Sequence, residues 1–265
     1  MIRRPPRSTL DRSSAASDVY KRQVKTCSVI NVIESTIARN SDWVLPIHAG
    51  PEIGVASTKA FLGQLIVLYI LCLKLASVRG DISKENFKKN IENLTKLPEA
   101  IKSTLKLEND IQIMAKEFID ARGTMFLGRG TSFPIALEGA LKLKELSYLH
   151  AEGYPAGEMK HGPLALIEEG LPVIVIAPKD RYYEKTLSNT QEVISRGGKI
   201  FLLTDNKKDA LSENIRFGLR VPHLDDLLSG ILFTVPLQLL AYHVALLKNC
   251  DIDKPRNLAK SVTVE

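Results

Sequence analysis

The sequence predicts an α/β protein with a parallel sheet, because short strand-like runs alternate with helices along much of the chain. The clearest unit starts with the apolar run 125–127, turns at a Gly-Arg-Gly tripeptide and enters a helix over 133–149. A second observation is an internal repeat, in which 28–76 and 199–247 each hold two strand-like runs followed by a long apolar helix.

Each copy of the repeat has the same order of elements. The first copy consists of the runs 28–33 and 43–47, a turn at Asn40 and Asp42 between them, and a helix from about 57 to 76. The second consists of the runs 199–204 and 215–221 and a helix over 227–247. Only the second copy is preceded by further elements, which are 125–127, 133–149, the run 171–176 and a helix over 182–195. We therefore expect one complete domain and the C-terminal half of another, joined by a charged helical linker over 83–118.

Composition narrows the class of protein. A chain of 265 residues is long enough to bury a real core. Cys27, Cys72 and Cys250 lie far apart without CxxC spacing, which argues against a zinc site or disulfide framework and favours the reducing cytoplasm. The longest apolar run, 61–76, is interrupted by two polar residues and is shorter than the roughly 20 apolar residues of a membrane span. It is interpreted as a core helix, and no membrane partner is expected.

The positive charge of the chain is concentrated at its beginning. The formal net charge is +6, but residues outside 1–23 include 30 basic and 28 acidic side chains, a net charge of +2. This gives no reason to expect nucleic acid as a partner. Residues 1–23 have no helical or strand period and no apolar signal-peptide core. We interpret them as a vector-derived or sequencing-adapter leader joined to a partial gene, and exclude them from the fold.

The helix over 133–149 carries an unusual charged stripe. Glu138, Lys142 and Glu145 fall on one face, because residues spaced i, i+4 and i+7 stack. Leucines flank the stripe on both sides, namely Leu137 and Leu141 on one and Leu143 and Leu146 on the other. A solvated helix has a single apolar face, so this helix is expected to be buried on both sides. Buried charges are paired or used in chemistry. A pair that only orders the helix is the alternative.

Three motifs, at 136–163, 48–61 and 251–265, together resemble one family. It is glutamine–fructose-6-phosphate aminotransferase (isomerizing), and the resemblance is to its sugar isomerase (SIS) part, from about Val24 to the last residue. It implies an α/β, SIS-type three-layer sandwich with a parallel sheet, one complete and one half SIS domain. The expected boundaries are a leader at 1–23, a half domain at 24–82, a linker at 83–114, a second SIS domain at 115–255 and an active-site tail at 256–265.

The resemblance implies an enzyme that converts fructose 6-phosphate and glutamine to glucosamine 6-phosphate and glutamate, the first step of UDP-N-acetylglucosamine synthesis. Such chemistry needs sugar ring opening and a proton shift between C1 and C2. By motif position, Glu145 resembles the base that moves this proton, and burial at an apolar seam generally raises a carboxyl pKa toward working pH. Lys142 resembles the residue that assists hydroxyl or amine proton transfer; a plain ion pair with Glu138 or Glu145 remains the alternative.

Further roles follow from the same resemblance. His161 precedes Gly-Pro in a predicted loop and resembles the histidine that promotes ring opening from a neighbouring subunit, so a homodimer is expected. Lys260 resembles the tail lysine that forms an imine with the open-chain sugar, for which desolvation lowers a lysine pKa. Ser57, beside the backbone of Val55, resembles substrate contacts at a helix start, where N–H groups favour anionic or hydroxyl ligands. No cofactor is expected, and no metal, because no two histidines have ligand spacing; His243 in an apolar helix is interpreted as a hydrogen-bonded core residue.

Two parts of the family pattern have no match in this sequence. They are the Ser/Thr-rich phosphate loop of the first SIS domain and the N-terminal glutaminase cysteine. We therefore expect the parent protein to be the full synthase and this fragment alone to be inactive or impaired. The turn at Gly128 and Gly130 could hold phosphate, but a lone GxG is a weak signal.

Two other functions remain open at this point. One is a non-catalytic SIS module that binds a sugar phosphate, which has no need of Glu145, His161 and the Lys260 tail together. The other is a stand-alone deglycase or isomerase with two SIS domains, against which the tail argues.

Overall fold

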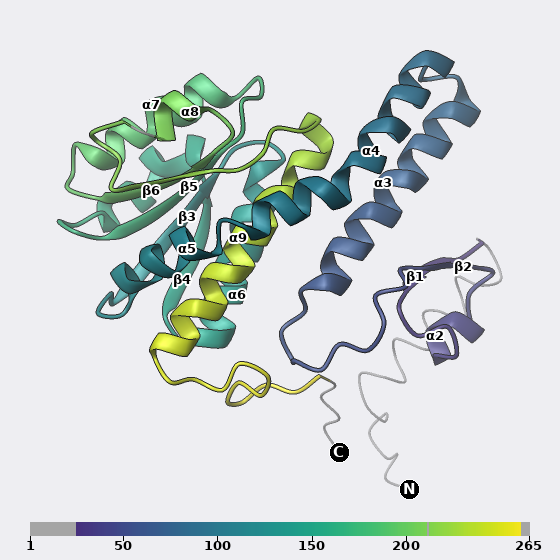
Figure 1. Cartoon of the computed structure of the whole chain (residues 1–265), viewed down its shortest axis with the longest axis horizontal. Coiled ribbons are helices and arrows are strands. Elements are labelled where there is room, and N and C mark those ends of the chain that lie inside the picture. Colours follow the sequence, from purple (N-terminus) through teal and green to yellow (C-terminus); the bar gives the residue numbers. More distant parts are fainter. Residues whose placement is uncertain (1–24, 211, 261–265) are drawn as a thin grey trace, which may run out of the picture. The chain divides into compact units, whose positions relative to one another are not determined.

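The computed structural model describes residues 25–210 and 212–260. These residues group into two units (Figure 1). The small unit holds 25–52 and 59–72, and the large unit holds 53–58 and the described residues from 73 onward.

The small unit contains a parallel strand pair, β1 (Cys27–Ile30) with β2 (Trp43–Pro46). A short helix, α2 (Thr36–Arg39), connects them, and the Ser35 hydroxyl caps it by accepting from the N–H of Ala38. Where β1 begins, the Asp42 carboxylate accepts hydrogen bonds from the Thr26 N–H at 2.8 Å and from Lys25 Nζ at 3.0 Å. The long helix α3 (Lys59–Arg79) begins in this unit, and its residues from Leu73 on belong to the large unit.

The large unit contains a five-stranded parallel sheet of order β4-β3-β5-β6-β7. Its strands are β3 (Gly123–Gly128), β4 (His150–Pro155), β5 (Pro172–Ala177), β6 (Lys199–Thr204) and β7 (Phe217–Arg220). Its helices are α4 (Lys84–Leu105), α5 (Glu108–Ala115), α6 (Ser132–Ser147), α7 (Tyr183–Ile194), α8 (Lys207–Ala210) and α9 (Asp226–Leu247). Three 3-10 helices complete it, η1 (Lys116–Phe118), η2 (Ala156–His161) and η3 (Pro163–Leu166).

Alternate residues of the central strands face opposite sides of the sheet, as the two-residue strand period requires. Met125 and Leu127 pack into a core with Val193 of α7 and Met159 of η2. Phe126 faces the other side, where a Cβ on Gly139 of α6 would be 2.9 Å from its ring. Helices therefore cover both faces, and α6 and α9 lie side by side on one of them (Figure 1). The three-layer α/β fold expected from the sequence is confirmed.

The structure also reproduces the internal repeat. In both copies a parallel strand pair is connected through a four-residue helix, α2 or α8, and the second strand leads through a loop to a long apolar helix. The sequence predicted only a turn at the first of these helices and no element at the second. It also missed β4, because the strand sequence from His150 to Pro155 has no apolar alternation. β4 is an edge strand, so one of its sides needs no partner.

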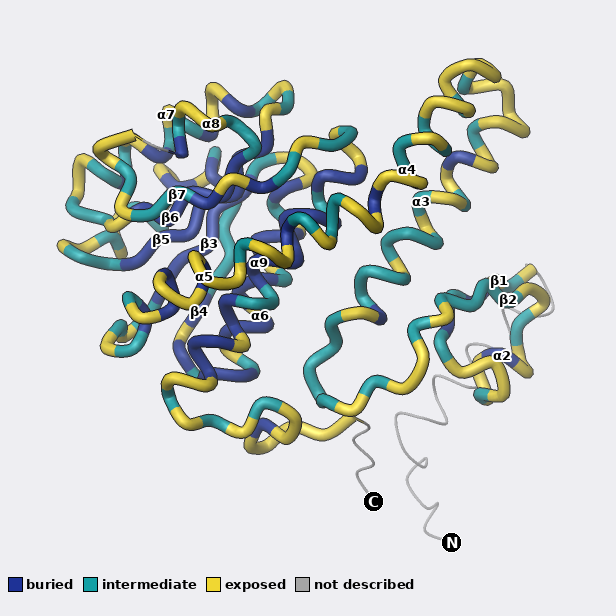
Figure 2. The backbone as a smooth tube through the Cα atoms, viewed as in Figure 1, coloured by how far each residue is buried: buried dark blue, intermediate teal, exposed yellow. Residues whose placement is uncertain are grey.

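The two long apolar helices differ in burial (Figure 2). Most of α9 is buried, whereas α3 exposes Leu75 (52%) and Val78 (71%), so the expectation that α3 is a core helix is wrong for the described structure. The reason is that the helices α6, α5 and α4 pack against α9, while few side chains among the described residues cover α3. Both helices are long and apolar enough to cross a membrane by length and composition, a test that core helices also pass.

Candidate functional site

Helix α6 has a packing reason to run close to the sheet. A Cβ on Gly139 would meet both Phe126 of β3 and Leu237 of α9 at less than 3.0 Å, so only glycine allows this approach. The helix starts four residues after β3 ends and stops at Tyr148, which adopts the left-handed conformation with φ 59° and ψ 13°. The charged stripe is therefore carried by a rigid element at the centre of the large unit.

The three charged residues of α6 contact one another. Lys142 Nζ lies 2.6 Å from Glu145 Oε2 and 3.7 Å from Glu138 Oε1. The exposed fractions of the side chains are 5% for Lys142, 11% for Glu138 and 22% for Glu145. A nearly buried ammonium thus lies between two carboxylates, and of the three, Glu145 is the most open to a ligand.

The leucine flanks of the stripe are not equivalent. Leu143 and Leu146 are buried, as expected, but Leu137 and Leu141 are 44% and 40% exposed. The expectation of burial on both sides is therefore wrong for one flank. Leu137 lies against Gly153 of the edge strand β4, beyond which no further strand of the sheet lies among the described residues.

Burial acts most clearly on Glu138. Desolvation raises the pKa of its carboxyl above the usual value of 4.5, and the repulsion from Glu145 adds to this, while Lys142 opposes it. The helical spacing predicted that Glu138 lies on the stripe, and the sequence assigned it no catalytic role. Helical spacing alone was enough to place Glu138 on the stripe. Its desolvation could not be predicted, because burial depends on the elements that pack around α6.

The predicted tail and loop residues also come together. The segment 53–58 lies against the segment 251–260, with the Val55 N–H donating to Asp253 O at 3.0 Å. Lys260 Nζ donates to Gly54 O at 2.8 Å. On the other side of the loop, Gln238 of α9 donates to Thr58 O at 3.3 Å. Lys260, Val55 and Ser57 therefore belong to one local structure, although about 200 residues of sequence separate the loop from the tail.

Three details of this cluster differ from the sequence expectations. Helix α3 begins at Lys59, so Ser57 precedes the helix start by two residues. The N–H of Val55 is already bonded to the tail, so it is not an open donor for a ligand. Lys260 is exposed, because the tail lies on the surface of the large unit, and it lacks the desolvation expected of an imine-forming lysine.

His161 lies apart from these groups. It ends η2 rather than lying in a loop, and Gly162 follows it with φ 139°, a conformation that favours glycine. Its side chain is 75% exposed, and Nε2 lies 3.9 Å from Glu158 Oε2. No interaction among the described residues joins His161 to the α6 stripe or to Lys260. His243 is buried, as expected, but the expected hydrogen bond is not found: its Nε2 lies 3.2 Å from Glu108 Oε1 and has no hydrogen-bond partner among the described residues.

The glycine turn after β3 is covered by a side chain. The ring of Tyr182 lies directly over Gly130, which has φ 57°. The guanidinium carbons of Arg129 and Arg181 lie 6.0 Å and 4.7 Å from the centre of this ring. A side chain larger than hydrogen at position 130 would therefore collide with Tyr182.

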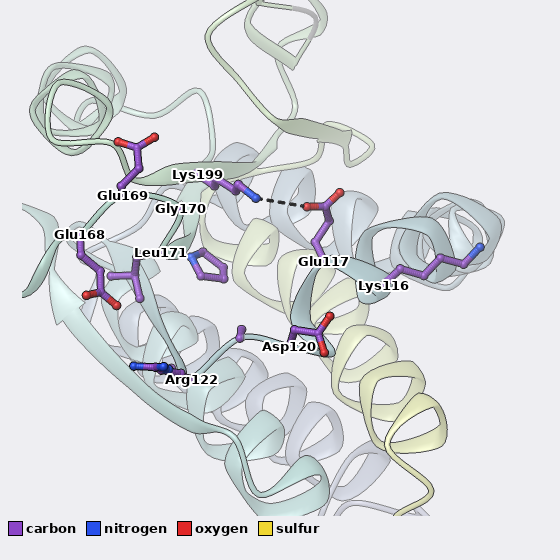
Figure 3. A pocket seen from close by; sticks show the side chains of 12 residues that line it. Lys116, Glu117, Asp120, Arg122, Glu168, Glu169, Gly170, Leu171 and Lys199 are labelled. Atoms are coloured by element: carbon purple, nitrogen blue, oxygen red, sulfur yellow. Dashed lines mark ion pairs between the residues drawn. The ribbon is translucent and has the colours of Figure 1, made fainter.

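A charged pocket of about 450 Å³ lies at the amino ends of the strands β3, β5 and β6 (Figure 3). Its lining includes Arg122, Glu168 and Lys199, and Glu117 pairs with Lys199 at 3.9 Å across it. None of the six residues predicted from the sequence lines this pocket. The candidate site is therefore the α6 stripe together with the loop and the tail.

The sequence matches a known protein family over most of its length. The SIS domain family profile matches residues 3–74 and 117–248. The first range begins inside the segment 1–23, which the sequence analysis set apart as a leader and which lies outside the described residues.

Two curated relatives that carry the same name illustrate the similarity. Glutamine–fructose-6-phosphate aminotransferase (isomerizing) of Bradyrhizobium diazoefficiens is 52% identical over 259 residues, which are 97% of this chain and 42% of the relative. The protein of the same name from Bartonella henselae is 51% identical over 243 residues, 91% of this chain and 40% of the relative. The chain thus spans about two fifths of the length of these relatives.

Solved structures agree with this. The C-terminal domain of glucosamine-fructose-6-phosphate aminotransferase from Francisella tularensis matches with a TM-score of 0.87 and 43% identity, over 91% of this chain and 69% of that one. A Thermotoga maritima structure described as glucosamine-6-phosphate deaminase matches with a TM-score of 0.70 and 29% identity, over 94% of this chain and 70% of that one. The chain therefore belongs to the SIS domain family, as a homologue of the C-terminal SIS region of glutamine–fructose-6-phosphate aminotransferase.

Proposed function

We propose that the chain is the sugar isomerase part of an enzyme that makes glucosamine 6-phosphate from fructose 6-phosphate and glutamine. The observation that carries this proposal is the buried Glu138–Lys142–Glu145 set on α6, which occurs in a chain about 50% identical to aminotransferases of that name. Lys142 donates a hydrogen bond to Glu145 and forms an ion pair with Glu138, and together the ammonium and the two carboxylates provide acid and base groups for moving protons on a sugar.

Each residue has a role in the proposed reaction. His161, from a neighbouring subunit of a homodimer, protonates the ring oxygen and opens the sugar. The Lys260 amine then adds to the C2 carbonyl and water leaves, which gives an imine. After nitrogen from glutamine replaces the lysine, Glu145 removes a proton from C1 and returns it to C2, and Lys142 holds and assists the adjacent hydroxyl or amine protons.

The loop and tail support this scheme by position. Lys260 donates to Gly54 in the loop that also holds Val55 and Ser57, so we propose that a sugar bonded to Lys260 lies beside this loop. Lys260 is exposed in the described structure, and we propose that bound sugar and the partner subunit bury it during the reaction.

Trapping of the imine tests the proposal. Residues 24–265 are fused to the preceding part of the Bradyrhizobium diazoefficiens relative and incubated with fructose 6-phosphate and borohydride, which reduces an imine to a stable amine. Mass spectrometry should find the sugar adduct on the peptide that contains Lys260. Lys260→Arg should abolish it, because a guanidinium is not a nucleophile at working pH. Lys254→Arg, which changes another exposed tail lysine, is the matched control and should keep it.

Either of two results would contradict the proposal. One is the absence of an adduct in the unchanged fusion protein, and the other is an adduct that persists in Lys260→Arg. Release of ammonia from glucosamine 6-phosphate without any synthesis from glutamine would instead favour a deaminase, the activity named for the Thermotoga maritima structure.

A further inference from the structure

The residue that ends α6 has a backbone conformation that tyrosine rarely adopts. Tyr148 is the C-cap of the helix, with φ 59° and ψ 13°, and its N–H donates to Lys144 O at 3.1 Å. Helices that end in this left-handed conformation usually have glycine there, because a Cβ is strained. A bulky residue in such a conformation persists only where the surrounding contacts hold it.

The Tyr148 side chain contacts the tail twice. Its hydroxyl oxygen accepts a hydrogen bond from the Arg256 N–H at 2.8 Å. The Arg256 guanidinium carbon also lies 4.1 Å from the centre of the Tyr148 ring, which is a close cation–π contact. The neighbouring Pro255 is buried, although most residues of 251–260 are exposed. Through these two contacts Tyr148 holds the tail at the C-terminal end of α6, the helix that contains Glu145.

The tail makes two further contacts, one on each side of Arg256 in the sequence. Asp253 O accepts from the Val55 N–H, and Lys260 Nζ donates to Gly54 O. Arg256 lies between these two residues in the sequence. An exposed segment held at its middle loses fewer degrees of freedom when its end binds, so a contact at Arg256 favours the contact at Lys260.

We propose that Tyr148 is a positioning residue, which holds the tail against the end of α6 so that Lys260 stays beside the loop 53–58. It acts through Arg256 and Lys260 and touches no substrate itself. The importance of this positioning for catalysis rests on the proposed role of Lys260. The contact between Tyr148 and Arg256 does not depend on that role.

The attachment is tested in the 265-residue chain without substrate. Tyr148→Phe removes the acceptor oxygen and keeps the ring. We expect hydrogen exchange at the Arg256 amide, measured by NMR, to become about fivefold faster, the loss expected for one hydrogen bond. Acetylation of Lys260 by N-hydroxysuccinimide acetate, measured by mass spectrometry, should become about twofold faster. The acetylation rate of Lys102, an exposed lysine on α4, should not change.

Tyr242→Phe is the matched control. Tyr242 lies on α9, and its hydroxyl makes no hydrogen bond in the described part of the chain. This variant should leave both rates at Arg256 and Lys260 unchanged. If Tyr148→Phe does not fold, Arg256→Pro removes the same hydrogen bond from the exposed side, and the acetylation of Lys260 should again become faster.

Unchanged exchange at Arg256 and unchanged acetylation of Lys260 in Tyr148→Phe would overturn the proposal. A general rise in the reactivity of all lysines would overturn it too, since that is the signature of a merely structural role. In the fused protein, Tyr148→Phe should also lower the yield of the borohydride adduct on Lys260. If the unchanged fusion gives no adduct, the proposed function fails while the attachment is still decided by the exchange and acetylation rates.

Discussion

Lys142 Nζ lies 2.6 Å from Glu145 Oε2, one turn along α6, and only 5% of the lysine side chain is exposed. An ammonium so buried is stable only while carboxylates compensate its charge. Glu138, at 3.7 Å, is the second carboxylate. The three groups therefore form one electrostatic unit, and removing any member leaves the remaining charges unbalanced.

Removal of the cation should be costly. Lys142→Met leaves Glu138 and Glu145 facing each other in a poorly hydrated place, and we expect a loss of about 3 kcal/mol in the free energy of unfolding. Lys102→Met is the matched control, because Lys102 pairs with Glu99 at the same i,i+3 spacing but both side chains are more than two thirds exposed. That change should cost less than about 0.5 kcal/mol. Urea unfolding measures both, and equal losses would contradict the prediction.

Glu138 should make stability depend on pH. Its folded-state pKa lies above the unfolded value of 4.5, so the folded protein binds this proton more tightly than the unfolded chain. The contribution is fully present below pH 4.5 and is lost as the pH rises through the folded pKa. Urea unfolding of Glu138→Gln at a series of pH values should show a shallower decline above this point than the unchanged protein. Glu99→Gln, at an exposed position, should leave the decline as it is.

Asp42 should act in the opposite sense. The hydrogen bond from the Thr26 backbone, with help from Lys25, lowers the pKa of Asp42 from 3.8 to about 2. Its contribution to the β1–β2 pair is therefore present above pH 3.8 and is lost as the pH falls through about 2. An NMR titration should give this low pKa, with the Thr26 amide shift following the same curve. A pKa near 3.8 would mean that the contact does not persist in solution.

Two glycines with positive φ should respond differently to alanine. At Gly80, with φ 78°, an added Cβ has open space around it, so Gly80→Ala should cost only the backbone strain of about 1 kcal/mol. At Gly130, with φ 57°, the Cβ would also collide with the Tyr182 ring, and Gly130→Ala should cost roughly 1–3 kcal/mol more. Thermal or urea unfolding measures the difference. Similar costs would show that Tyr182 swings away without penalty.

The first copy of the repeat should open more readily than the second. The helix α3 exposes large apolar side chains, while α9 is buried among the helices α6, α5 and α4, so fewer contacts resist local unfolding in 24–82 than in 115–255. Hydrogen exchange should be fast across 24–82 and slow in 125–149 and 171–204. Uniformly slow exchange would mean that α3 has found a partner in solution, and light scattering would then test for a second copy of the chain.

The sequence by itself determined the features that depend on local spacing. Helical periodicity placed Glu138, Lys142 and Glu145 on one stripe, and the structure brings them into contact. Comparison of the two repeat copies predicted parallel strand pairs that lead to long apolar helices, and the structure has both. Hydrophobic periodicity and the order of elements along the chain depend only on residues that are close in sequence. They can therefore be inferred without knowing which segments pack together.

Only the tertiary structure decided which surfaces those elements cover. The helices α3 and α9 are both apolar on all sides, yet one is exposed and the other buried, because burial depends on what packs against a helix. For the same reason no local pattern predicted that β4 is a strand or that Leu137 and Leu141 are exposed. Nor did a local pattern predict the contacts of Lys260 with Gly54 and of Arg256 with Tyr148. These contacts join residues more than 100 positions apart, and a chain finds them only when its elements assemble around a common core.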